Sequence, residues 1–287
     1  MEHVRWIQRP TLNRPVLLAA FEGWSDAGDA ATTTARYLRD RWDGELFASI
    51  DPEDFYDFTS TRPQVRLDDD MEREIVWPAN DCYAASVPGA DLDAVVLLGT
   101  EPQLRWRTFC RQVTELAQTL DVRMVVTLGA LLAEVPHSRP VSVIGTAADD
   151  DLITRLGLRR STYQGPTGIV GVLHDACKQA GIPSASLWAT VPAYVPGAPS
   201  PKAALALVER ASELLQVTVA ATDLEIASAA YERQVSELVA ADDDMAGYVS
   251  NLEERFDTDE DEEEIQIPTG DELMREVERF LRDQGQG

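Results

Sequence analysis

Positive charge is scarce in this chain of 287 residues, which has 25 Lys and Arg against 50 Asp and Glu and a formal net charge of −25. A protein that binds DNA or RNA neutralises phosphates with Lys and Arg, and attraction to an anionic membrane surface depends on the same residues. The shortage of cations therefore excludes nucleic acid and membrane as expected partners.

Cysteine is also scarce. The three cysteines, Cys82, Cys110 and Cys177, are odd in number and lack paired spacing, so a disulfide framework is excluded and core thiols in a reducing cytosol are expected. No Cys or His pair has the spacing of metal ligands, and neither a G-x-G-x-x-G motif, a P-loop nor a G-x-S-x-G elbow is present. We therefore expect no metal and no cofactor.

Long hydrophobic runs are missing too. The longest nearly apolar run, residues 124–133, is far shorter than the roughly 18 to 20 residues of a membrane span. The first residues do not combine a basic segment with an apolar one, as a secretion signal would. We expect a cytoplasmic protein.

Short apolar runs that alternate with amphipathic segments form the main pattern of the chain. Apolar runs of this kind are typical of strands in a sheet that is covered on both faces. The predicted strands are 16–21, 45–50, 93–99, 122–128, 141–145 and 186–191. The predicted helices between them include 29–41, 106–120 and 169–180. The alternation predicts an α/β fold with a mostly parallel sheet between two helical layers.

The chain divides into four predicted regions. In order they are an α/β domain at 1–200, a helical extension at 201–256, an acidic linker at 257–270, and a short amphipathic helix with its tail at 271–287. Within the first region, residues 51–88 are predicted to form an antiparallel excursion, with a hairpin that pairs 64–67 with 74–77. The linker is a block of like charges that repels itself and cannot pack.

A glycine-bracketed turn, residues 165–168, runs directly into the amphipathic helix at 169–180. Thr167 is predicted to cap this helix, its hydroxyl accepting hydrogen bonds from the free N–H groups of the first turn. The positive end of a buried helix attracts either a bound anion or a carboxylate of the same protein, and both alternatives stay open at this point.

Four loops follow or adjoin predicted strands, at 22–29, 99–106, 129–140 and 163–168. In an open α/β sheet such loops converge at the carboxyl ends of the strands, where these folds bind ligands. The candidate catalytic acid–base residues are Glu22, Glu101 and His137. The candidate ligand-binding residues are Asp26, Arg105, Thr167 and Gly168. The alternative interpretation is that the two glutamates only hold loops in place, through backbone N–H groups or through Arg105.

Five segments form a further pattern, in order along the chain. They are Phe21-Glu-Gly-Trp-Ser-Asp-Ala-Gly-Asp29, Gly99-Thr-Glu-Pro-Gln-Leu-Arg-Trp106, Thr127-Leu-Gly-Ala-Leu-Leu-Ala-Glu-Val-Pro-His137, Gly165-Pro-Thr-Gly-Ile-Val-Gly171 and Ser186-Leu-Trp-Ala-Thr-Val-Pro192. Together these segments resemble the PAC2 family, the proteasome assembly chaperone 2 family, in its high-GC bacterial branch.

This resemblance implies a three-layer α/β/α sandwich similar to nucleoside phosphorylases, with self-association and proteasome subunits as partners. Within the family we expect a homo-oligomer, and a trimer in particular. The last residues, 283–287, lack the hydrophobic-Tyr-any motif with which chaperones of this type often grip the proteasome α-ring. The first functional hypothesis, which rests on this resemblance, is a non-enzymatic, oligomeric protein-interaction or proteasome-assembly-chaperone-like factor. The alternative is a small-molecule-binding protein, or a hydrolase- or phosphorylase-like enzyme, that uses the loop cleft.

Overall fold

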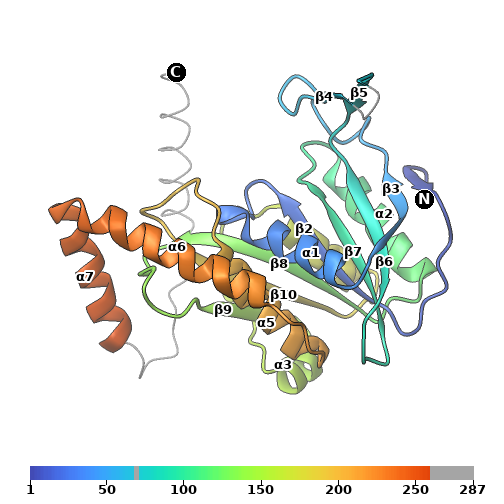
Figure 1. The fold of residues 1–287 in the computed structure, drawn as a ribbon. Coiled ribbons are helices and arrows are strands. Elements are labelled where there is room, and N and C mark those ends of the chain that lie inside the picture. The colour runs from blue at the N-terminus through green and yellow to red at the C-terminus, as the bar shows by residue number, and fades with distance from the viewer. Residues whose placement is uncertain (68–70, 259–287) are drawn as a thin grey trace.

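The computed structural model describes residues 1–67 and 71–258, and in that part of the chain one large sheet lies between two helical layers (Figure 1). The strands of this sheet are β1 (Val4–Trp6), β2 (Val16–Glu22), β3 (Glu45–Ile50), β6 (Asn80–Ser86), β7 (Asp93–Thr100), β8 (Met124–Ala133), β9 (Val143–Ala147) and β10 (Ser184–Pro192). The helices are α1 (Ala30–Arg41), α2 (Trp106–Thr119), α3 (Asp150–Leu156), α4 (Ile169–Gln179), α5 (Pro201–Leu215), α6 (Thr222–Ala240) and α7 (Asp243–Thr258), with a short 3-10 turn η1 (Ala27–Asp29) before α1. The predicted α/β/α sandwich is confirmed.

The strands lie in the order β1-β3-β6-β7-β2-β8-β10-β9. The parallel pairing expected from the sequence holds for the four central strands, β7, β2, β8 and β10. Both flanks are antiparallel. On the β6 side this is the arrangement expected for residues 51–88, whereas at β9 the expectation of a mostly parallel sheet is wrong. The connections between strands explain these directions. In the described residues no helix separates β3 from β6 or β8 from β9, and without a crossover helix the chain reverses direction.

Successive side chains of the central strands point to opposite faces of the sheet and fill two separate cores. Leu18 and Ala20 of β2 pack in the core that contains α1 and α5, whereas Leu17 and Ala19 pack in the core that contains α2 and α4. These four side chains are fully buried. A strand covered on both faces needs apolar residues at every position, and that is why the apolar runs in the sequence located the strands.

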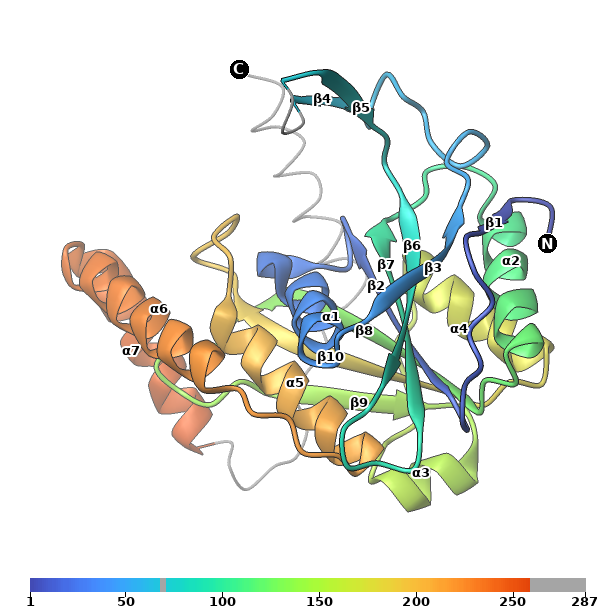
Figure 2. The same cartoon turned by 45° about the vertical axis from the view of Figure 1, so that its right-hand side comes forward.

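The predicted hairpin forms a separate two-stranded ribbon of β4 (Gln64–Leu67) and β5 (Arg73–Val76), which projects from the sheet (Figures 1 and 2). Val65 lies opposite Ile75 in the register, and Leu67 is two residues further on the same face. All three side chains are more than half exposed. The ribbon therefore keeps an apolar face in contact with solvent.

The helices after residue 200 confirm the helical character expected there, and α6 and α7 extend away from the sheet (Figure 2). Helix α5 packs on the sheet through Leu207 and Val208, which are buried in the same core as β2. Within the described residues no helix has both the length and the apolar character needed to cross a bilayer. The predicted linker lies outside the described residues except for its first two positions, which belong to α7, and the predicted 271–287 helix lies outside them entirely.

Candidate functional site

The loops that follow β2 and β7 meet at the carboxyl ends of these parallel neighbours, as the sequence predicts. Glu22 ends β2, and its carbonyl oxygen accepts a hydrogen bond of 2.8 Å from the backbone N–H of Glu101. The Glu22 carboxylate forms an ion pair with Arg36 of α1 and accepts a hydrogen bond of 3.4 Å from the Thr100 hydroxyl. Glu22 is thus a half-exposed residue that links β2, β7 and α1.

The carboxylate of Glu101 occupies the amino end of α4. Its Oε1 accepts a hydrogen bond of 2.7 Å from the backbone N–H of Ile169, the first residue of that helix. The capping position belongs to Gly168, so the prediction that Thr167 caps α4 is wrong. A carboxylate at a helix amino terminus supplies both a hydrogen-bond acceptor and a favourable charge. Of the two alternatives left open by the sequence, the structure contains the carboxylate of the same protein.

Gly168 is at the closest approach between these segments. A Cβ atom at this position would lie 2.8 Å from Glu101 Oε1 and 2.8 Å from Ser25 Oγ. Ser25 is itself buried, and its hydroxyl has no hydrogen-bond partner among the described residues. The absence of a side chain at Gly168 is therefore what lets the 22–26 loop, Glu101 and α4 pack together.

Replacing Glu101 with alanine is expected to lower the free energy of unfolding by about 2 kcal/mol, because α4 loses its charged cap. Glutamine at the same position keeps an oxygen acceptor, so Glu101→Gln should lose less than half as much. Urea unfolding of the two variants measures the difference. Equal stability of Glu101→Ala and the wild type would contradict a capping role.

Asp26 caps the neighbouring helix α1 in a similar way and is only 6% exposed. Its carboxylate accepts hydrogen bonds from the backbone N–H groups of Ala31 and Thr32, at 2.8 and 3.1 Å, and from the Thr32 hydroxyl at 2.5 Å. Burial raises the pKa of Asp26 to about 6, against the effect of these hydrogen bonds. Asp26 therefore titrates between the usual ranges of carboxylic acids and histidine.

Arg105 forms an ion pair with Asp54 and not with Glu101. It precedes α2 with a positive φ of 53°, and its Nη1 lies 2.6 Å from the carboxylate of Asp54. The sequence had offered Arg105 as a partner for Glu101, but the Glu101 carboxylate bonds to α4 instead. This ion pair connects the start of α2 to the segment that precedes the β4–β5 ribbon.

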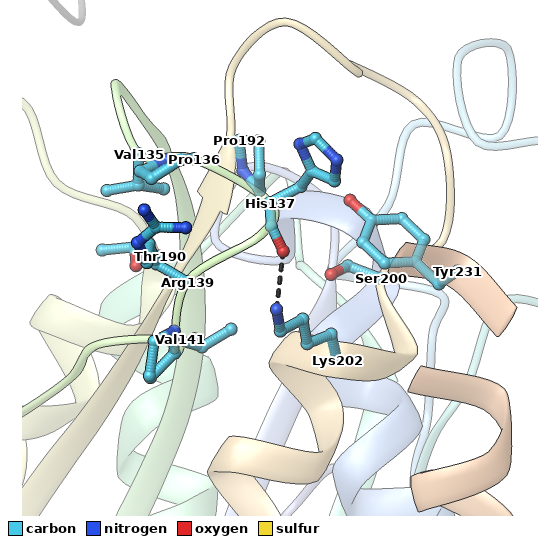
Figure 3. A pocket seen from close by; sticks show the side chains of 11 residues that line it. Val135, Pro136, His137, Arg139, Val141, Thr190, Pro192, Ser200, Lys202 and Tyr231 are labelled. Atoms are coloured by element: carbon cyan, nitrogen blue, oxygen red, sulfur yellow. Dashed lines mark hydrogen bonds between the residues drawn. The ribbon is translucent and has the colours of Figure 1, made fainter. Parts of the chain in front are cut away.

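His137 is the buried centre of a second cluster. Only 4% of the residue is exposed, and its ring nitrogens contact the Tyr194 hydroxyl through Nδ1, at 2.7 Å, and the Ser236 hydroxyl through Nε2, at 2.9 Å. The Nζ of Lys202 donates a hydrogen bond of 2.6 Å to the His137 carbonyl oxygen (Figure 3). Burial, and then the charge of Lys202, lower the pKa of His137, so the ring is neutral at pH 7.

The space around His137 is small. Figure 3 shows His137, Ser200, Lys202 and Tyr231 around a pocket of about 10 Å³, which is room for about one water molecule. The same loop binds the helical extension, since Arg139 forms two hydrogen bonds of 2.7 Å with the carboxylate of Asp257 in α7. In this structure, the His137 loop connects the sheet to α6 and α7.

The structure places five of the seven predicted site residues in two groups. Glu22, Asp26, Glu101 and Gly168 surround the ends of β2 and β7, whereas His137 contacts residues from α5, α6 and the loop after β10. The partners of His137 are between 57 and 99 positions away in the sequence, and no local pattern could have identified them. No group of three or more His, Cys, Asp or Glu side chains in the described part of the chain is arranged to hold a metal ion.

The sequence of this chain was compared with models of known protein families. A sequence model of the PAC2 family matches residues 20–239, which contain Glu101, His137 and every strand of the sheet from β3 onward. The chain belongs to the PAC2 family. No protein with a curated description matches it significantly.

Crystal structures of three relatives have the same fold as this PAC2 protein. The PAC2 family protein of Streptomyces avermitilis is 45% identical, with a TM-score of 0.76 over 82% of this chain and 99% of that one. A proteasome-assembly chaperone homologue of Mycobacterium tuberculosis is 44% identical, with a TM-score of 0.75 over 82% and 99% of the two chains. A second M. tuberculosis protein, of unknown function, is 28% identical, with a TM-score of 0.79 over 89% of each chain.

Proposed function

We propose that this PAC2-family protein is a non-enzymatic, self-associating assembly factor in the cytoplasm that binds proteasome subunits. The observation that carries the proposal is its 44% identity to the proteasome-assembly chaperone homologue of M. tuberculosis, which this chain matches over 99% of that protein's length. A trimer is the assembly state that we propose.

The contacts of the candidate catalytic residues support a non-enzymatic role. A general acid or base must reach the substrate within hydrogen-bond distance. Glu101 is bonded to α4, Glu22 is paired with Arg36, and His137 is enclosed beside a pocket of about 10 Å³. Small-molecule sites are usually 300–1,000 Å³ in volume. Each of the three residues has a structural partner that accounts for its presence.

The second candidate function is small-molecule binding, or hydrolase- or phosphorylase-like catalysis, at the ends of β2 and β7. One observation favours it: the buried Ser25 hydroxyl without a partner adjoins Gly168 and lies next in sequence to Asp26, whose pKa is about 6. A donor without a partner and a carboxyl group with a perturbed pKa are features of binding sites. Such a site would require the 22–26 loop to open.

Native mass spectrometry of the protein purified from its own host distinguishes the two functions. We expect a species near three times the subunit mass of 31.6 kDa, together with complexes that also contain proteasome α-subunits. A reproducible small-molecule adduct that Glu101→Gln abolishes would favour the second function. A monomer without protein partners or adducts would contradict the proposed assembly role.

A further inference from the structure

A pocket of about 400 Å³ lies at the opposite end of the sheet from the loops described above. It is formed where β2 and β8 begin, beside the β6–β7 turn and the carboxyl ends of α3 and α5, which gather at the lower edge of Figure 2. Its volume is within the usual range for small-molecule sites. None of the candidate site residues lines this pocket.

The wall of the pocket is apolar. It is formed by buried residues from the starts of β2 and β8 and the end of α5, with two half-buried leucines beside them. These residues are Val16, Leu92, Met124, Leu156, Leu214 and Leu215. A hydrocarbon chain that enters the pocket would exchange water for these side chains, which is favourable in proportion to the apolar area removed from solvent.

Positive charge surrounds this apolar wall. Arg14, Arg123 and Arg155 line the pocket together with a single acidic residue, Asp91. The lining is therefore cationic, although the whole chain has a net charge of −25. Such a local reversal of sign attracts anions to one place on a surface that otherwise repels them.

The three arginines differ in their partners. Nη1 of Arg14 lies 2.6 Å from the Asp91 carboxylate, and Nη1 of Arg155 lies 3.8 Å from that of Asp151. The Arg123 side chain forms no hydrogen bond or ion pair with any described residue; only its backbone N–H is bonded, to the Pro15 carbonyl oxygen at 2.9 Å. Arg123 thus has a guanidinium group available to an incoming anion.

Helix α5 ends beside the pocket, and two carbonyl groups of its last turn already accept hydrogen bonds. The carbonyl oxygens of Ser212 and Glu213 in the last turn of α5 accept hydrogen bonds from the backbone N–H groups of Val217 and Gln216. Such a cap satisfies the acceptors that a helix end would otherwise expose. Arg123 is the lining arginine that forms no ion pair with a described residue, and it is the group that would recognise an anion here.

We propose that this pocket binds a small amphipathic carboxylate, such as a medium-chain fatty acid. The carboxylate pairs with the Arg123 guanidinium, which offers planar, two-point recognition of this group. The hydrocarbon chain lies against Met124, Leu214 and Leu215. This proposal is independent of the proposed assembly role, because it concerns the opposite end of the sheet.

Titration with octanoate, followed by the NMR signal of the Met124 methyl group, tests the proposal. The signal is assigned with Met124→Leu. We expect a saturable shift with a Kd below about 1 mM, weakened about tenfold in Arg123→Gln through loss of a charge-assisted bond. Arg233→Gln is the matched control, since Arg233 is an exposed arginine on α6 outside the pocket lining, and it should bind octanoate like the wild type.

Octanamide, which has the same chain without the charge, should bind more weakly than octanoate. The proposal is overturned if octanoate causes no saturable shift of the Met124 signal. It is also overturned if Arg123→Gln binds octanoate as tightly as the wild type, or if octanamide binds equally well. Because the Arg123 side chain forms no hydrogen bond or ion pair within residues 1–67 and 71–258, its replacement should leave the melting temperature unchanged, and a loss of binding will not reflect unfolding.

Discussion

Replacing Gly99 with alanine is expected to lower the free energy of unfolding by about 3 kcal/mol. A Cβ atom at this position of β7 would lie 2.1 Å from the carbonyl oxygen of Ala79 and 2.7 Å from the Cα of Asn80. Both are backbone atoms, which cannot rotate out of the way as a flexible side chain can. Gly99 pairs with Asn80 in the sheet, so the two strands must separate to make room.

Gly247→Ala is the matched control for this substitution. Gly247 lies inside α7, and an added Cβ would meet no atom within 4 Å. Alanine is more favourable than glycine in a helix interior by about 0.5–1 kcal/mol, so this variant should be slightly more stable than the wild type. Urea midpoints of the two variants should therefore move in opposite directions. Unchanged stability of Gly99→Ala would mean that β6 and β7 are not packed as described.

The second large effect is expected at Asp26. Alanine there removes the acceptor of three hydrogen bonds, including those from the backbone N–H groups of Ala31 and Thr32. Buried donors without partners are costly, and α1 loses its cap, so we expect a loss of about 3 kcal/mol. Asp26→Asn keeps one acceptor oxygen and should lose less. Thermal unfolding at pH 7 measures both values, and a variant Asp26→Ala as stable as the wild type would contradict the capping role.

The pKa of Asp26 also predicts how its contribution depends on pH. Its folded-state pKa of about 6 is above the ordinary value of 3.8, so the folded protein binds this proton more tightly than the unfolded chain does. As the pH rises from about 4 to about 6, the stability of the wild type relative to Asp26→Asn should fall, and above that range the difference should be constant. A shift of about 2 pKa units corresponds to about 3 kcal/mol.

The wild type must be compared with Asp26→Asn because two histidines change the stability with pH in the direction opposite to Asp26. Burial lowers the pKa of His137 and of His174 below the ordinary 6.5. The unfolded chain gains protons on these rings at a higher pH than the folded protein does, so their contribution to stability is lost as the pH falls below about 6.5. Both proteins contain these histidines, and the difference between them therefore isolates Asp26. A difference that does not change between pH 4 and 6 would contradict the raised pKa.

The sequence was sufficient to locate the elements that are buried on both faces. The apolar run in β2 and the helical stripe in α2 are local patterns, and both elements appear where they were predicted. Strand direction is not local: the antiparallel direction of β9 relative to β10 was not predicted, because it depends on how the chain turns back after β8 without a helix. The three-residue strand β1 and the short helix α3 are too brief to produce a periodic signal, and the sequence pattern did not predict them.

The contacts of the candidate site were also only partly predictable from local sequence patterns. Proximity of Glu22 and Glu101 could be predicted, because both follow parallel strands that turned out to be neighbours. The contact between Glu101 and Ile169 joins residues 68 positions apart, and only the folded chain reveals that this carboxylate occupies the helix end assigned to Thr167. The contact of His137 with Ser236 spans an even larger separation, 99 positions.

The central position of β2 also has a consequence for the chain while it is being synthesised. This strand is made early, but its neighbours in the sheet are β7 and β8, and the second of these ends at Ala133. At about 5–20 residues per second, the ribosome needs roughly 5–20 seconds to add the residues between β2 and the end of β8. Until β7 is complete at Thr100, the most apolar strand near the amino terminus has neither neighbour to pair with, and it lacks β8 until Ala133 has been added. A nascent chain of this protein therefore exposes the future centre of its sheet before the neighbouring strands exist.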